Sequence, residues 1–194
     1  NNFLVDCVEF RHVVEYTIKH TTMEITASNL KYPYLPNGRV ILYVPIDSIY
    51  MSAAKEIALT SYDRAMPTGA VAVIEGDIIA KASNKPPLRN NFLVNLHKKY
   101  CIRRIFGIPS GQKYWLCPGC AGSENHAESR VSTELKKKGN TKPFDLYLWG
   151  HWWGCEPCWT AMISAGVKDV YLLDRSEILF NNLNKDNIIG RQFQ

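Results

Sequence analysis

The chain has 194 residues, of which 46% are hydrophobic and 21% charged, and its formal net charge is +5. These proportions are ordinary for a well-packed soluble protein with one domain and an extension. The sequence has no apolar run of about 18 residues, which excludes a membrane-spanning helix, and its first residues show no secretory signal. The positive charge suits an anionic ligand, although a solvated helix face is the commoner explanation of a Lys run.

The first 45 residues differ in character from the rest. Residues 39–44 are mostly β-branched or apolar and predict a strand, and residues 31–38 before them are rich in turn formers. We therefore divide the chain into a β-rich N-terminal extension, residues 1–45, and a main domain, residues 46–194. No role for the extension follows from its residues.

The main domain is predicted to contain helices and strands in a nearly alternating order. The expected elements are a helix over 47–62, a hairpin over 70–80, helices over 96–106 and 126–138, a strand over 146–149, a helix over 157–165, a strand over 170–173 and a helix over 176–180. Strand–helix–strand connections favour parallel neighbours joined by right-handed crossovers. The order therefore predicts a mixed sheet covered by helices.

The six cysteines stand at positions 7, 101, 117, 120, 155 and 158. They include two Cys-x-x-Cys pairs, and no secretory signal accompanies them. This combination favours thiolate–metal chemistry in a reducing compartment over a disulfide framework. We therefore expect a cytoplasmic protein in which Cys7, outside both pairs, is a buried apolar residue.

The segments His126-Ala-Glu128 and Cys155-Glu-Pro-Cys158 carry the strongest functional signal. One imidazole and two thiols are three zinc ligands, and three protein ligands leave a fourth position open for water, as in a catalytic site. Each segment begins a predicted helix, whose N-terminal dipole lowers thiol pKa values. Glu128 is close enough to move the proton of that water without binding the metal. The pattern predicts hydrolytic deamination of a nucleobase.

The sequence resembles the cytidine deaminase superfamily over residues 48–180. Residues 67–74, 76–80 and Asn84 are similar to that family's first hairpin and the loop after it. The resemblance implies a three-layer α/β/α cytidine-deaminase-like fold, with a mixed sheet and helices on both faces. It also implies three substrate contacts: Asn84 with the sugar hydroxyl, the backbone of Ala127 with the base carbonyl, and Ala70 beneath the ring.

Within the superfamily, the chain looks most like the deoxycytidylate (dCMP) deaminases. The similarity lies in Cys101-Ile-Arg103, residues 107–111 and Cys117, upstream of the His-Ala-Glu segment. It implies conversion of dCMP and water to dUMP and ammonia, with zinc-bound hydroxide attacking C4 and Glu128 as the proton shuttle. It also implies a small-molecule nucleotide substrate and a homo-oligomer such as a hexamer. Gly154 departs from the family, which usually has Pro before its first Cys.

Three further groups of residues leave alternatives open. Cys101, Cys117 and Cys120, with His97 as a fourth ligand, are spaced for a second, structural zinc site, or they are free thiols in a packed loop. Trp153, like Trp152, either stacks on a pyrimidine ring or packs in the core. The basic residues that could bind a phosphate, unless they are simply exposed charges, are Lys85, Arg89 and Arg130.

Two other functions compete with nucleotide deamination. A deaminase of cytosine or adenine in single-stranded DNA or RNA would use basic groups and Trp residues as a channel. A noncatalytic zinc module would use the same fold for binding only. Glu128 argues against the second, because a structural site needs no carboxylate beside an open position.

Overall fold

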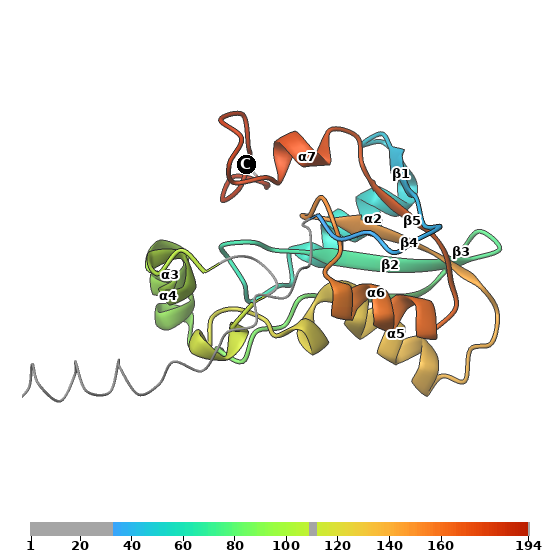
Figure 1. The fold of residues 1–194 in the computed structure, drawn as a ribbon, viewed down its shortest axis with the longest axis horizontal. Coiled ribbons are helices and arrows are strands. Elements are labelled where there is room, and N and C mark those ends of the chain that lie inside the picture. Colours follow the sequence, from blue (N-terminus) through green and yellow to red (C-terminus); the bar gives the residue numbers. More distant parts are fainter. Residues whose placement is uncertain (1–32, 109–111, 194) are drawn as a thin grey trace, which may run out of the picture. The chain divides into compact units, whose positions relative to one another are not determined.

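The structure, a computed structural model, describes residues 33–108 and 112–193. Most of the predicted N-terminal extension, residues 1–32, lies outside this part of the chain, and Cys7 lies there too. Of the helices within it, none has the length and apolar character needed to cross a membrane. The described residues from Pro33 onward belong to one unit of the chain, and Figure 1 shows a sheet at its centre.

The sheet has five strands in the order β1-β5-β4-β2-β3. They are β1 (Ile41–Val44), β2 (Gly69–Ile74), β3 (Asp77–Ser83), β4 (Phe144–Trp149) and β5 (Val167–Leu173). β4 runs parallel to β5, and β2 is antiparallel to both of its neighbours, β3 and β4. The predicted mixed sheet is confirmed. β1 was assigned to the N-terminal extension, but it pairs in parallel with β5 and forms an edge of this sheet.

Helices cover both faces of the sheet (Figure 1). One face carries α2 (Ile49–Ala58) and the short α7 (Ser176–Leu179), and the other carries α5 (Ala127–Lys137) and α6 (Glu156–Ser164). Two separate groups of buried apolar side chains fill the spaces between the layers. The predicted three-layer α/β/α arrangement, with helices on both faces of a mixed sheet, is confirmed.

Local chemistry accounts for the start of α2 and for the tight hairpin. The Ser48 hydroxyl caps α2 by accepting a hydrogen bond from the Met51 amide, with 3.5 Å between oxygen and nitrogen. Glu75 and Gly76 connect β2 to β3 with φ angles of 52° and 92°. Two consecutive residues at positive φ make the two-residue turn whose twist matches that of paired strands.

The predicted helix over residues 96–106 is wrong in its bounds. The structure has α3 (Asn91–Lys99) and α4 (Ile102–Ile105), separated at Tyr100 and Cys101. Asn90 caps α3 earlier than expected, because its side-chain oxygen accepts a hydrogen bond from the Leu93 amide at 3.2 Å. Cys101 is extended, with φ −72° and ψ 118°, and its sulfur lies 3.5 Å from that of Cys120. This tertiary contact coincides with the break in the helix.

Two 3₁₀ helices, η1 (Tyr114–Leu116) and η2 (Ser123–Asn125), lie between α4 and α5. The second ends at His126, which is also the residue that precedes α5. The chain thus enters α5 through a tight turn, and that turn fixes the backbone from which the His126 side chain projects.

Gly69 allows β2 to lie directly against α2. A Cβ atom at this position would overlap the carbonyl oxygen of Ala54 and lie 2.6 Å from the amide nitrogen of Ala58. We expect Gly69→Ala to destabilise the fold by about 2–3 kcal/mol, which would lower the melting temperature by roughly 5–10 °C. Thermal unfolding of the purified variant measures this, and an unchanged melting temperature would contradict the close packing of α2 on β2.

Candidate active site

Three side chains from the starts of two neighbouring helices meet at one point. His126 precedes α5, Cys155 precedes α6, and Cys158 lies in the first turn of α6. One donor atom from each lies within 4.8 Å of the other two. His126 Nδ1 is 3.3 Å from the Cys158 sulfur and 3.6 Å from the Cys155 sulfur, and the two sulfurs are 3.1 Å apart. The structure therefore brings together the three residues predicted as zinc ligands.

Neighbouring groups orient these three side chains. His126 Nε2 lies 3.2 Å from the carbonyl oxygen of Ala121 and donates to it, so that Nδ1 is the nitrogen with a free lone pair. Nδ1 is also the atom that faces the sulfurs. The Ser129 hydroxyl donates to the Cys158 sulfur at 3.3 Å. Hydrogen bonds of this kind fix the orientation of metal-binding side chains.

The electrostatics of the pair of thiols favour one thiolate. The hydrogen bond shared with Cys158 lowers the pKa of Cys155 to about 5, against the opposing effect of burial. Burial raises the pKa of the Cys158 thiol, and the anionic neighbour adds to that rise. The environment of the pair thus favours a thiolate at Cys155 over one at Cys158. A divalent cation would favour loss of the second proton as well.

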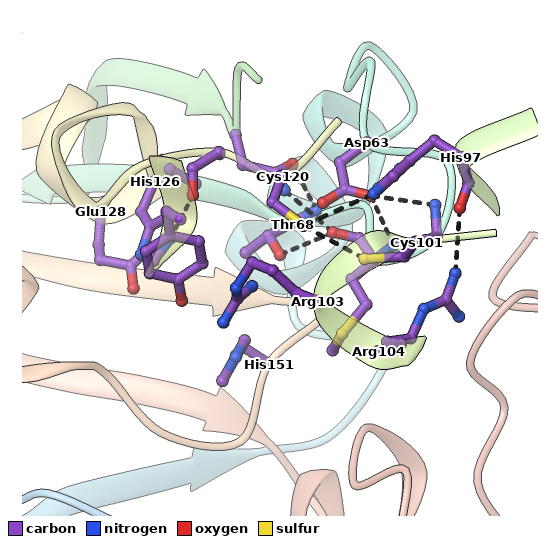
Figure 2. Close-up of a pocket in the computed structure, with 16 residues that line it drawn as sticks. Asp63, Thr68, His97, Cys101, Arg103, Arg104, Cys120, His126, Glu128 and His151 are labelled. Carbon is purple, nitrogen blue, oxygen red and sulfur yellow. Dashed lines mark hydrogen bonds between the residues drawn. The ribbon is translucent and has the colours of Figure 1, made fainter. Parts of the chain in front are cut away.

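The donor set fits zinc. One imidazole nitrogen and two thiol sulfurs form part of a tetrahedron, and an open fourth position is the arrangement of catalytic zinc sites. Glu128 follows His126 by two residues, is only 4% exposed, and lines the same cavity as His126 (Figure 2). The site therefore combines a zinc donor set with a buried carboxylate beside it.

The residues predicted to bind substrate divide into two groups. Asn84 and Ala127 line the cavity with His126 and Glu128. Ala70 and Trp153 are not among the described residues that line it: Ala70 is fully buried in β2, and Trp153 is 5% exposed. The roles predicted for these four residues stay predictions.

Asn84 is tied firmly to the loop before β2. Its side-chain oxygen accepts hydrogen bonds from the Thr68 amide at 3.0 Å and from the Ser61 hydroxyl at 2.5 Å. Its side-chain nitrogen donates to the carbonyl oxygen of Met66 at 3.0 Å. An amide group has two N–H donors, so the second is the group of Asn84 that can serve a ligand.

Asp63 and Tyr114 are among the residues of the cavity wall that sequence reasoning missed. The Asp63 carboxylate accepts hydrogen bonds from the amides of Ala65 and Met66, both at 3.1 Å. Burial raises the pKa of Asp63 to about 6 in spite of these bonds. Tyr114 packs its ring edge to face with His126, with 5.1 Å between the ring centroids. Neither residue belongs to a recognisable motif, so only the fold could place them here.

His151 also lines the cavity. Burial lowers the pKa of His151 to about 4, and His126 adds to this effect. The three basic residues named as phosphate candidates are not in the described lining. Among them, Arg130 donates to the carbonyl oxygen of Ser83, and Arg89 lies over the Tyr62 ring at 4.6 Å from its centroid.

Comparison with known proteins identifies the family. A model of the cytidine and deoxycytidylate deaminase zinc-binding region matches residues 45–174. The chain belongs to this family. No curated protein sequence matches the chain. Among solved structures, the apo form of the dCMP deaminase from the cyanophage S-TIM5 is similar at 22% sequence identity and a TM-score of 0.40, covering 70% of this chain and 89% of that one.

This member of the deaminase family contains a second group of metal-binding residue types. His97, Cys101, Cys117 and Cys120 are all buried, and one donor atom from each lies within 4.8 Å of the others. The Cys120 sulfur is 3.5 Å from both the Cys101 sulfur and His97 Nε2. The geometry matches the Cys₃His donor set of closed, structural zinc sites. His97, Cys101 and Cys120 also line the cavity that contains Glu128 (Figure 2).

Proposed function

We propose that this deaminase hydrolyses the amino group of a cytosine nucleotide, converting dCMP and water to dUMP and ammonia. One observation carries the proposal. The imidazole of His126 and the thiols of Cys155 and Cys158 converge on one point, beside a cavity that Glu128 also lines. An open metal position and a buried carboxylate facing one cavity are the two parts that deamination of a base needs.

The chain's own residues have separate tasks in this reaction. Zinc, when bound by His126, Cys155 and Cys158, supplies an activated water near neutral pH. Glu128 accepts the proton of the attacking water, passes it to the ring nitrogen of the base and later protonates the leaving amine. Because Glu128 is buried, its carboxylate competes with few solvent molecules for that proton.

Ala127 and Asn84 are proposed to position the substrate. Ala127 is the first residue of α5, and the amide of a first helical residue has no partner within its helix. That amide can donate to the carbonyl oxygen of the base from the cavity wall. The remaining N–H of Asn84 can donate to a sugar hydroxyl. Both residues line the cavity that Glu128 faces, as this proposal requires.

The burial of Trp153 argues against its use as a stacking platform for a polynucleotide. Enzymes that bind single strands present exposed aromatic rings on which successive bases stack. Trp153 packs edge to face with His151 and with Trp152, at centroid distances of 5.3 and 6.3 Å. A side chain that is 5% exposed offers little surface for stacking.

We also propose that His97, Cys101, Cys117 and Cys120 bind a second zinc ion with a structural role. Four donors on α3, before α4 and in the loop before α5 leave no open coordination position. The ion would join three separate segments of the chain.

The substrate is tested with the zinc-loaded protein on a panel of compounds. We expect turnover of dCMP, slower turnover of CMP and deoxycytidine, and no turnover of single-stranded DNA or of an RNA stem-loop. Mass spectrometry detects the increase of about one mass unit that accompanies deamination, in which the amino group leaves as ammonia and a carbonyl oxygen and a ring N–H take its place, a net exchange of NH for O. Turnover of oligonucleotides without turnover of dCMP would overturn the proposed substrate.

A further inference from the structure

The cavity of the proposed active site contains permanent positive charge. Among the described residues that line it, Arg103 and Arg104 are the two arginines, whose positive charge persists at any ordinary pH (Figure 2). Both come from α4, which lies next to the second cysteine cluster. Lysine does not occur in this lining, so the positive charge that the cavity offers a substrate comes from guanidinium groups.

The two arginines are held in different ways. Arg104 donates from Nη2 to the carbonyl oxygens of His97 and Lys98, at 3.2 and 2.6 Å, and so neutralises the C-terminal end of α3. Arg103 donates from Nε to the carbonyl oxygen of Gln112 at 2.9 Å. Its guanidinium carbon also lies 4.1 Å from the centroid of the Tyr114 ring. The plane of the Arg103 guanidinium is thereby fixed before any ligand arrives.

His151 adds a neutral donor to the same cavity. Its Nδ1 accepts a hydrogen bond from the amide of Trp153 at 3.3 Å. A neutral imidazole carries its proton on the nitrogen that does not accept, so Nε2 of His151 is the donor. The low pKa of His151 agrees with a neutral ring at physiological pH. The edge-to-face contact with Trp153 holds the ring in this orientation.

We infer that Arg103 and His151 form the subsite that binds the 5′-phosphate of the nucleotide substrate. The inference rests on the proposed function. It adds the residues that would make the enzyme prefer a nucleotide to a nucleoside. The positive charge of the Arg103 guanidinium attracts a phosphate group, and the imidazole N–H of His151 can donate to an oxygen of the same group. Lys85, Arg89 and Arg130, which the sequence suggested for this role, do not line the described cavity.

The burial of Arg103 also favours a phosphate monoester. Its side chain is 7% exposed, so an anion must enter the cavity to reach it. The phosphate of a mononucleotide ends the molecule and can enter alone. A phosphodiester in DNA or RNA has a nucleotide attached on each side. Both neighbouring nucleotides would have to lose their solvent for the phosphate to enter the cavity.

Kinetics of the full chain, loaded with zinc, test the subsite. We expect Arg103→Gln to lower kcat/KM for dCMP by roughly 10- to 100-fold, mainly through KM, because it removes a charge-assisted hydrogen bond. The value for deoxycytidine, which has no phosphate, should change little. Arg89→Gln is the matched control, since it removes an arginine outside the described lining and should leave the ratio of the two substrates unchanged. Equal losses for both substrates in Arg103→Gln would overturn the inference.

Arg103 also hydrogen-bonds to the Cys120 side chain, so Arg103→Gln changes a contact of the cysteine cluster as well. A second variant, His151→Phe, leaves that contact in place. If Arg103→Gln loses metal, His151→Phe decides: a selective loss for dCMP supports the subsite, and an unchanged ratio overturns it. Failure of the proposed function looks different, because the wild-type protein would then deaminate none of the panel. Calorimetric titration with dCMP and with deoxycytidine still tests the subsite in that case, through the affinity difference that Arg103→Gln should abolish.

Discussion

Glu128→Gln is expected to reduce kcat for dCMP by roughly 10²- to 10⁴-fold, the usual contribution of a positioned acid–base group. Gln keeps the size of the side chain but cannot accept and return a proton. Since Glu128 is not among the donors of the three-residue cluster, zinc content should stay the same. Steady-state kinetics together with metal analysis measures both quantities on one preparation.

Glu134→Gln provides the control for this variant. Glu134 lies on the same helix, α5, but is exposed and forms an ion pair with Lys138 at 2.7 Å. Exposed pairs of this kind contribute little to stability, so the control should keep both activity and zinc. Activity that survives in Glu128→Gln would exclude the proposed proton transfer. Loss of zinc in that variant would instead make Glu128 a ligand.

The convergence of the candidate zinc ligands was predictable because their spacing is local. His126 and Glu128 are separated by one residue at the start of a helix, and Cys155 and Cys158 occupy one helical turn. The helix that follows His126 lies between β3 and β4 in the sequence, and the helix that contains Cys158 lies between β4 and β5. Because these strands belong to one sheet, the order of the elements brings the starts of the two helices together. The mixed sheet followed from the same order of elements. These features need no knowledge of distant contacts.

Other parts of the cavity depend on tertiary structure and could not be predicted. Asp63 and Arg103 reach it from loops and short helices whose path no periodicity describes. The helix predicted over residues 96–106 is interrupted at Cys101, whose sulfur contacts that of Cys120, nineteen residues away in the sequence. The sequence does not determine whether Trp153 is exposed or buried. In the structure Trp153 is buried, because it packs against His151 and Trp152.

Cys117→Ser is expected to remove one of two zinc ions and to lower the melting temperature by roughly 10 °C or more. A structural zinc ion contributes several kcal/mol to folding, and each kcal/mol corresponds to about 2–4 °C in a chain of this size. Activity at low temperature should fall less, because Cys117 does not line the described cavity. Metal analysis and thermal unfolding are the measurements.

Cys155→Ser gives the opposite pattern and serves as the comparison. It alters the cluster beside Glu128, so activity should be lost while the second zinc ion remains bound. Comparison of Cys117→Ser with Cys155→Ser also shows whether the cluster of Cys101, Cys117 and Cys120 binds metal or consists of packed thiols. A cluster without metal would contain buried thiols that pack like small apolar side chains. Replacing one of them by Ser would then cost about 1–2 kcal/mol, and wild-type protein with a single zinc ion would confirm that the cluster is metal-free.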